Sequence, residues 1–359
     1  MKFFVSLITL LLTITPIANA GPINPAHISA DAKWIFHLNL EQARKWELVK
    51  QWHAKMEQQD KYKKHLKKWV TKLGMDPTKN LLGVTLYDNT YARHNGIVLL
   101  AIQNVDRKTL ATQFNKNHPE ATSTTYRKRH LSTWVEKRGP YGSHEVTGCL
   151  VNDGLIVMGG NPNRVREALD VIDGHRESLG EGRKVLQGFD TEAILACRAI
   201  DVDEQYQKNT RCPVLQRCHT ATMSFSVKND VMHLKYNLLA ESAEVASRMK
   251  GAVTGCIAIM NLQLGDDDEA EQLVDAIEVD AQGKRLLINW QAPSETFYKV
   301  LKNQMKTWRD KHKSGWHWHN KDKHQPSQDT PGHTRSKKSR HTSKKEKKQQ
   351  RDPYNDFDL

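Results

Sequence analysis

The stretch MSFSVKNDVMHLKYNL, residues 223–238, decides the fold class. Apolar residues occupy every second position on both sides of the polar group Lys228-Asn229-Asp230. Successive side chains of a β-strand point to opposite faces, so this alternation gives each strand one apolar and one polar face. The stretch therefore predicts a β-hairpin with one face on a core and the other in water.

The same order of strand, turn, strand and helix recurs elsewhere in the chain. It is found at residues 84–114, 149–174 and 277–308, where Asp106, Asn161-Pro162 and Pro293-Ser294 are typical helix starts. Two further strands are predicted at 34–38 and 193–199. Together these elements predict an α+β fold of two related halves. In each half, antiparallel β-hairpins are followed by a helix, and the helices pack on the sheet.

The N-terminus has the pattern of a secretory signal peptide. Lys2 precedes the largely apolar run 3–14, and Ala18-Asn19-Ala20 forms a cleavage site before Gly21. An N-terminal membrane anchor is the alternative. No later run is long and apolar enough to suggest a transmembrane helix. We expect an exported chain in a periplasmic, cell-surface or extracellular location, divided into signal peptide 1–20, first half 21–180, second half 190–312 and tail 313–359.

The longest predicted helix runs from Glu41 to Leu73 and ends at Gly74. Its apolar residues recur at helical spacing, with lysines on the other faces. Packing of this stripe on the sheet is the favoured interpretation, because a sheet needs a cover. A basic helix that carries Trp can also lie on a membrane surface, and this remains the alternative.

Several segments resemble an uncharacterised family of secreted proteins that is typical of planctomycete-like bacteria. The resemblance rests on residues 28–38, 82–87, 98–100, 125–126, 146–149 and 168–174, and it continues weakly to about Trp290. It covers most of the body and none of the tail. The resemblance implies a shared fold and export. The family has no assigned activity, so no catalytic residue follows from it.

Motifs for known chemistry are sparse. Ser143-His144-Glu145 follows a Gly- and Pro-containing segment and is interpreted as a surface turn. Gly159-Gly160-Asn161-Pro162 opens a helix, whose N-terminus is suited to an anion, although every such junction has this property. Asp266 to Glu269 is interpreted as a helix start, with calcium binding as the alternative. Catalytic residues stay unknown, and no cofactor is predicted.

The five cysteines show no metal-ligand or redox spacing. Cys212 and Cys218 flank a short loop, and an exported protein is permitted disulfides, so these two are the candidate pair. Cys149 and Cys256 lie in apolar stretches and are interpreted as small buried residues.

The C-terminal tail is strongly basic. Between Arg309 and Arg351 there are fourteen Lys or Arg against four Asp or Glu, in a chain of net charge +13. Such a segment buries too little apolar surface to fold, and it binds polyanions without sequence preference. The candidate anion-binding residues are Lys337, Lys338, Arg340, Lys344, Lys345, Lys347 and Lys348. His317 and His319 are weak candidates for a metal ion.

These features favour a non-enzymatic binding or envelope-associated protein whose polycationic tail contacts an anionic polymer or lipid headgroups. A hydrolase or transferase with a site assembled from distant residues is one alternative. Weak metal binding through the His-containing tail is another. The sequence indicates no oligomeric state and no disulfide pairing beyond the candidate above.

Overall fold

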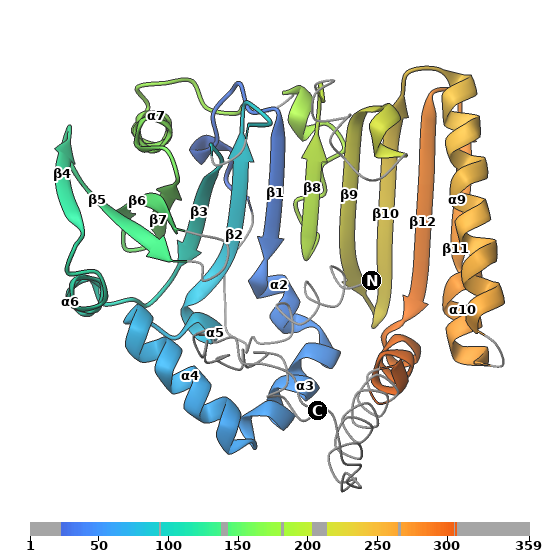
Figure 1. Ribbon diagram of the computed structural model, residues 1–359, viewed down its shortest axis with the longest axis horizontal. Helices are drawn as coiled ribbons and strands as arrows, with labels where there is room; N and C mark the ends of the chain where they lie inside the picture. The colour runs from blue at the N-terminus through green and yellow to red at the C-terminus, as the bar shows by residue number, and fades with distance from the viewer. Residues whose placement is uncertain are drawn as a thin grey trace, which may run out of the picture. The chain divides into compact units, whose positions relative to one another are not determined.

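The computed structural model describes residues 23–92, 95–137, 143–180, 183–202, 214–264, 267–304 and 306. The chain divides into two compact units, residues 1–305 and 306–359. Every element discussed below belongs to the first unit. It is built on one twelve-stranded sheet in the order β11-β12-β10-β9-β8-β1-β2-β3-β7-β6-β5-β4, in which all neighbours pair antiparallel (Figure 1). The α+β class predicted from the alternating pattern is confirmed.

The elements have the following bounds. The strands are β1 (Trp34–Asn39), β2 (Leu81–Asp88), β3 (Ile97–Ile102), β4 (Thr122–Tyr126), β5 (Arg129–Lys137), β6 (Ser143–Asn152), β7 (Leu155–Gly159), β8 (Leu195–Ala199), β9 (Cys218–Lys228), β10 (Val231–Ala240), β11 (Ile277–Gln282) and β12 (Arg285–Pro293). The helices are α2 (Leu40–Lys45), α3 (Glu47–Glu57), α4 (Asp60–Leu73), α5 (Pro77–Asn80), α6 (Arg107–Asn117), α7 (Pro162–Ile172), α9 (Ala243–Leu264) and α10 (Asp268–Asp275), and residues 294–304 form a further helix.

The two halves of the sequence share this sheet. β1 pairs with β2 on one side and with β8 on the other, so the first strand of each half lies at the junction. In each half, the first three strands lie next to one another in chain order, and the last strand of that half lies beside the third. The order outward from the junction is β1, β2, β3 and β7 in the first half and β8, β9, β10 and β12 in the second. The sheet therefore has a central ladder that belongs to both halves.

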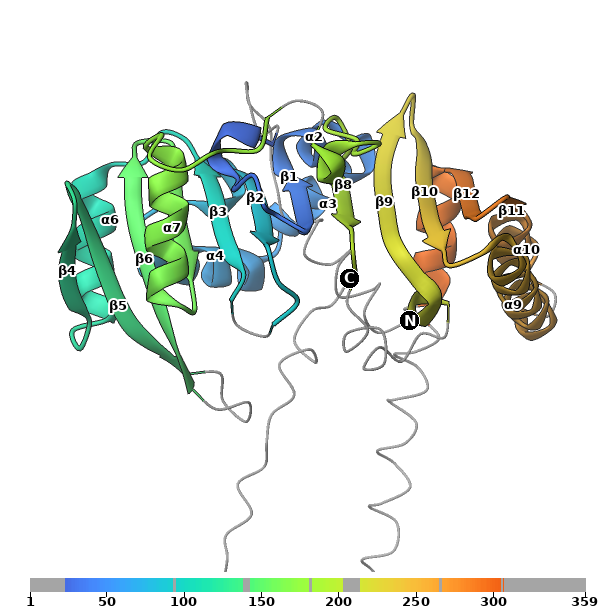
Figure 2. The same ribbon diagram turned by 90° about the horizontal axis from the view of Figure 1, so that it is seen from above.

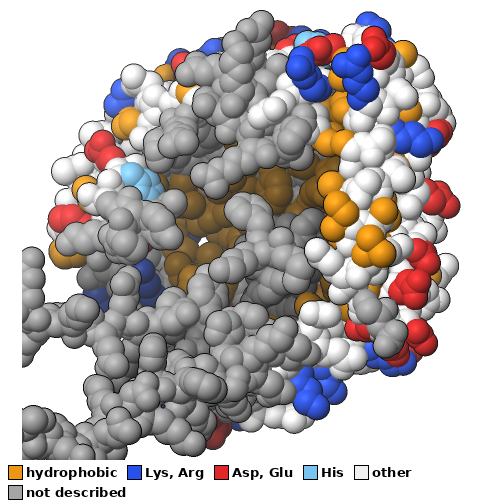
Figure 3. All heavy atoms as spheres, turned by 45° about the vertical axis from the view of Figure 1, so that its right-hand side comes forward, with side chains coloured by type: hydrophobic (Ala, Val, Ile, Leu, Met, Phe, Trp, Pro, Cys, Tyr) orange, Lys and Arg blue, Asp and Glu red, His pale blue; other side chains and the backbone are white. Residues whose placement is uncertain are grey.

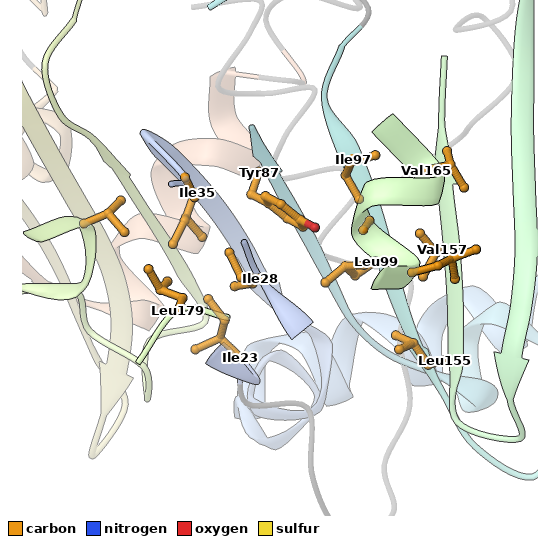
Figure 4. Close-up of a cluster of buried hydrophobic side chains, with 14 of the residues drawn as sticks. Ile23, Ile28, Ile35, Tyr87, Ile97, Leu99, Leu155, Val157, Val165 and Leu179 are labelled. Carbon is orange, nitrogen blue, oxygen red and sulfur yellow. The ribbon is translucent and has the colours of Figure 1, made fainter. Parts of the chain in front are cut away.

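One face of the first half is covered by α7 and the segment before β1. Ile35, Tyr87 and Leu99 point to this face and are buried, together with Val165 and Leu169 of α7 (Figure 4). Arg164 of α7 forms an ion pair with Asp88, whose side chain is fully buried at the end of β2. This ion pair ties the helix to the sheet.

Helices of both halves cover the other face at its margins. Trp46, Val49 and Trp52 from α2, α3 and their junction are buried in a cluster with Leu38 of β1. Ala246 and Met249 of α9 form a second cluster with Leu238 and Leu286 on β10 and β12. Figure 2 shows the sheet from above, with α9 and α10 at the end opposite to α6 and β4.

Several helix ends form as the sequence predicts. An Asp106 carboxylate oxygen accepts a hydrogen bond from the backbone N–H of Thr109 at 2.9 Å, and Asn161 Oδ1 accepts one from that of Asn163 at 3.0 Å. Gly74 ends α4 with a φ of 72°, a left-handed conformation in which Gly has no steric penalty. Capping signals in this chain are thus reliable guides to where helices begin and end.

The single helix predicted from Glu41 to Leu73 is wrong. The chain is extended at Trp46 (ψ 125°) and at Gln59 (ψ 121°), and these two residues separate α2, α3 and α4. Trp46 donates a hydrogen bond from its indole Nε1 to Ser294 Oγ at 2.9 Å while its ring is buried. Tertiary packing therefore overrides the local helical preference. The first part of the stripe, through Tyr62, packs in the cluster with the sheet as favoured above, whereas Trp69 is exposed.

Two features of the first half were not anticipated correctly. Ser143-His144-Glu145 opens strand β6 and does not form a turn, because it pairs with Val135, Glu136 and Lys137 of β5. Strands β4 and β5 were missed altogether. Thr122–Tyr126 is exposed over its first four residues and has no apolar alternation that could mark it as a strand.

Candidate apolar binding surface

A row of apolar side chains crosses nine neighbouring strands on one face of the sheet. The antiparallel register places Phe36 of β1 opposite Leu86 of β2 and Cys197 of β8. Continuing outward in both directions, this central row consists of Met158, Val98, Leu86, Phe36, Cys197, Met223, Tyr236, Ile288 and Val279. All nine side chains are half-buried. We call the face that carries this row the apolar face.

A second row runs beside the central one on the same face. It consists of Leu150, Ile156, Leu100, Val84, Leu38, Leu195, Phe225, Leu234, Trp290 and Ile277. Leu38 and Leu195 at its centre are buried, and the other members are half-buried. The two rows together make a continuous apolar surface across both halves of the sheet.

Part of this surface does not take part in the packing of the buried core. Leu86, Val98, Cys197, Leu234 and Tyr236 belong to none of the three buried clusters formed by the described residues. Figure 3 shows hydrophobic side chains gathered deep in a hollow on this side of the molecule. Half-buried apolar side chains outside the core are typical of a surface that receives an apolar ligand.

The opposite face of β9 and β10 is polar. The row Ser224, Lys235 and Asn289 lies on it, and Thr222 there accepts a hydrogen bond from Arg198 Nη1 at 2.8 Å. The sheet of the second half is thus amphipathic, as the hairpin at 223–238 predicts. Its polar side is suited to contact with water, whereas its apolar side is suited to contact with other apolar groups.

The electrostatics of the apolar face keep it uncharged. Burial raises the pKa of the Cys197 thiol to about 11 and that of the Tyr236 hydroxyl to about 12. Both side chains are therefore neutral at physiological pH. The central row presents no charge to a ligand over its nine members.

Helix α9 adds exposed apolar side chains at the margin of the sheet. Ile259, Met260 and Leu262 are 55%, 40% and 85% exposed, and the segment from Gly251 to Leu264 contains no charged residue. Its first half packs on β10, β11 and β12, while its second half extends apolar surface into solvent. Helices of a water-facing surface usually carry charge on their outer side, which this segment lacks.

A buried polar cluster lies beneath the helical layer. Arg44 is 1% exposed and donates from Nη2 to the backbone oxygen of Leu81. Burial lowers the pKa of Arg44 to about 10, and the nearby carboxylate of Glu41 counteracts this effect. His53 lies 3.3 Å from the Tyr62 hydroxyl through Nε2. Arg44 thus ties α2 to β2, and the His53–Tyr62 contact joins α3 to α4.

A small cavity lies between α2 and the turn that joins β9 and β10. Its volume is about 200 Å³, and Trp46, Glu47, Glu192 and Asp230 are among the residues that line it. The three carboxylates are exposed, and Glu47 is paired with Lys50 at 3.1 Å. The volume of the cavity lies below the roughly 300–1,000 Å³ that is usual for small-molecule pockets.

The site residues expected from sequence fall in separate places. Asp267 starts α10 by accepting from the backbone N–H of Ala270, which confirms the helix-start interpretation. Cys149 is buried as expected, whereas Cys256 is exposed on α9, so the expectation for Cys256 is wrong. Cys218 is buried with its Sγ 3.2 Å from the Val214 oxygen.

Other predicted sites lie outside the described residues. These are Cys212, the signal peptide, the histidines His317 and His319, and the tail lysines Lys337, Lys338, Lys344, Lys345, Lys347 and Lys348 with Arg340. Within the described part of the chain, no group of three or more His, Cys, Asp or Glu side chains is placed to hold a metal ion. None of its helices combines the length and apolarity needed to cross a membrane.

The sequence pattern predicts that the alternating apolar residues of every hairpin face a core. It could not separate a covered apolar row from an open one, because both have the same period of two. For α9 a signal was available, since the uncharged run from Gly251 to Leu264 is visible in the sequence. Its exposure, however, follows only from the fold.

The fold and this surface define an α+β protein with one antiparallel sheet, one face of which is apolar and partly covered by helices. No family model and no curated protein matches the chain. Among solved structures it is similar to crystal forms III and I of TP0453, a treponemal protein, with 9% and 10% identity and TM-scores of 0.44 and 0.43. The matches cover 80% and 79% of this chain and 100% and 99% of those chains. No function is taken from this similarity.

Proposed function

We propose that this chain is an exported, non-enzymatic binding protein whose apolar face takes up a ligand with a hydrocarbon chain. The observation that carries the proposal is the central row, in which nine half-buried apolar side chains lie side by side on neighbouring strands. Burial of each methylene group of a hydrocarbon chain contributes about 0.8 kcal/mol. A long row of this kind offers such a chain contact over much of its length.

The polycationic tail completes the proposal as a second, independent contact. Its lysines would hold the protein near anionic polymers or lipid headgroups, with an affinity that falls as salt rises. Export is supported by the signal-peptide pattern before Gly21. The matching order of strands in the two halves supports an origin from an internal repeat.

The apolar face is tested with dansylaminoundecanoic acid, a fluorescent fatty acid, titrated into the purified protein. Leu234→Gln and Leu86→Gln place an amide on the apolar face in the two halves. Leu287→Gln is the matched control, since Leu287 is also half-buried but lies on the opposite face, across from Asn237 and Asp280. Thermal unfolding followed by circular dichroism checks that all three variants fold.

We expect saturable binding by the native protein and a rise in Kd of about tenfold for each apolar-face variant, as removal of one Leu contact implies. The control should stay within about twofold of the native value. Absence of saturable binding, or equal losses in all three variants, would overturn the proposal.

The tail is tested separately on a heparin column. Replacement of Lys337, Lys338, Arg340, Lys344, Lys345, Lys347 and Lys348 by Gln should lower the salt concentration needed for elution. Elution at an unchanged salt concentration would show that these residues do not bind the anionic polymer. The proposal for the apolar face would be unaffected.

A further inference from the structure

Helix α4 places a cationic surface beside the apolar face. Lys64, Lys67, Lys68 and Lys72 are exposed, and Asp60 is the only acidic residue of the helix. Asp60 lies 3.7 Å from Lys63, so its charge is already paired. The outer side of α4 therefore carries a net positive charge that faces solvent.

The inner side of the same helix joins the apolar surface. Tyr62 is buried and Leu66 is half-buried, and both pack into the cluster that contains Phe36 and Val84 of the two rows. The inner side of α4 thus belongs to the same apolar cluster as part of the two rows. In Figure 1 the helix lies below α5, near the lower end of β2, and α9 stands at the opposite edge of the sheet.

Trp69 lies at the boundary between these two sides. It follows Leu66 by three positions, so it continues the apolar stripe, yet 58% of its side chain is exposed. Lys72 is three residues further along and lies next to it on the helix surface, and Lys68 lies one turn before Lys72. A Trp at such a boundary presents an apolar ring and a polar N–H to the two parts of an amphiphile.

We propose that the ligand of the apolar face is an anionic amphiphile and that α4 binds its head group through Lys68 and Lys72, with Trp69 against the first part of the chain. The proposal rests on the proposed function and adds the charge of the ligand and the position of its head group. A Lys ammonium is a compact point charge suited to a carboxylate or a phosphate. The neutral row beyond α4 receives the chain.

The test compares dansylaminoundecanoic acid with its methyl ester, which has the same chain and no charge. Lys68→Gln/Lys72→Gln removes the two lysines next to Trp69. Lys63→Gln/Lys67→Gln is the matched control, since both lysines are exposed and the pair makes the same change of charge on the opposite side of the same helix. Trp69→Ala tests the boundary residue. All variants keep the complete tail, so its contribution is the same in each.

We expect the acid to bind the native protein more tightly than the ester. Lys68→Gln/Lys72→Gln should weaken the acid about fivefold and leave the ester unchanged, as two solvent-exposed ion contacts imply. The control pair should leave both probes unchanged, and Trp69→Ala should weaken both. A phosphate head group is tested in a third experiment, in which lysophosphatidic acid competes with dansylaminoundecanoic acid for the protein.

Each failure has a separate meaning. Equal affinity of the acid and the ester for the native protein overturns the anionic head group and leaves the proposed function standing. If both Lys-pair variants lose the same affinity for the acid, the proposed position of the head group next to Trp69 is overturned. If neither probe binds the native protein, the proposed function fails, and this inference fails with it.

Discussion

Phe36 of β1 lies directly opposite Cys197 of β8 in the antiparallel ladder that joins the two halves of the sheet. Because both side chains point to the apolar face, the central row passes from one half to the other without interruption. Neither half presents the complete surface alone. The ladder between β1 and β8 is thus part of the binding surface as well as of the fold.

The ion pair between Arg164 and Asp88 gives the first prediction. Asp88 is fully buried, so Arg164→Met leaves a buried carboxylate with less compensation and should cost about 3 kcal/mol in the free energy of unfolding. Arg248→Met is the control, because Arg248 and its partner Glu244 are 75% and 73% exposed, and its cost should stay below about 1 kcal/mol. Urea unfolding measures both values. Equal losses of unfolding free energy in the two variants would contradict a structural role for the Arg164–Asp88 ion pair.

Gly74 gives the second prediction. Its φ of 72° is unfavourable for other residues, and a Cβ there would lie 3.1 Å from both the Leu110 Cα and the Thr109 oxygen of α6. Gly283 has a φ of 56° with open space around it. Gly283→Ala should therefore cost about 1 kcal/mol, and Gly74→Ala should cost more because of the added contact with backbone. Similar melting temperatures of the two variants would show that α6 moves away without cost.

His53 gives the third prediction, on pH. Burial lowers its pKa from the ordinary 6.5, although Glu57 and Asp76 counteract this effect and Lys79 adds to it. The unfolded chain then binds the proton more readily than the folded one, so stability is complete above pH 6.5 and is lost as the pH falls below it. Urea unfolding at about pH 7.5 and about pH 5 measures the loss.

His53→Gln removes the titrating group and serves as the reference for this measurement. Its free energy of unfolding should change less between the two pH values than that of the native protein. Tyr62, which faces His53 at 3.3 Å, stays neutral over this range because burial raises its pKa to about 12. An identical pH dependence in both proteins would place the acid sensitivity elsewhere.

The exposed half of α9 gives the fourth prediction. Ile259→Ser and Leu262→Ser remove apolar groups that are mostly in solvent, so each should change stability by less than about 0.5 kcal/mol. Both should shorten retention on a hydrophobic-interaction column. Ala246→Ser on the buried side of the helix should destabilise the protein, because it places a hydroxyl in the core. Marked destabilisation by Leu262→Ser would mean that this residue is covered in the folded protein.

The sequence predicts local structure well where a single physical signal dominates. The alternation at 223–238 gives β9, the turn and β10, and Asp106 and Asn161 cap the helices that they were expected to start. It predicts less well where packing competes with local preference, as at Trp46, whose buried ring and bond to Ser294 interrupt a helical pattern. The polar strand β4 lacks the signal altogether.

The candidate surface depends on strand neighbours, which the sequence does not specify. Phe36 and Tyr236 lie two hundred residues apart along the chain, and their common row exists only because β8 and β9 separate β1 from β10. The exposed lysines of α4 were recognised as the polar side of a helix. That Trp69 would stay uncovered at their border follows from the end of the packed layer near Leu66.

The place of β1 in the sheet has a consequence for biosynthesis. β1 emerges from the ribosome early, and β2 follows soon, but the edge of β1 that β8 will occupy has no partner until the chain has been extended far beyond α7. Through that interval the nascent chain exposes unpaired backbone N–H and C=O groups of the kind that promote aggregation. Pairing with β8 closes this edge, so the first half is protected only once the second half has joined the sheet.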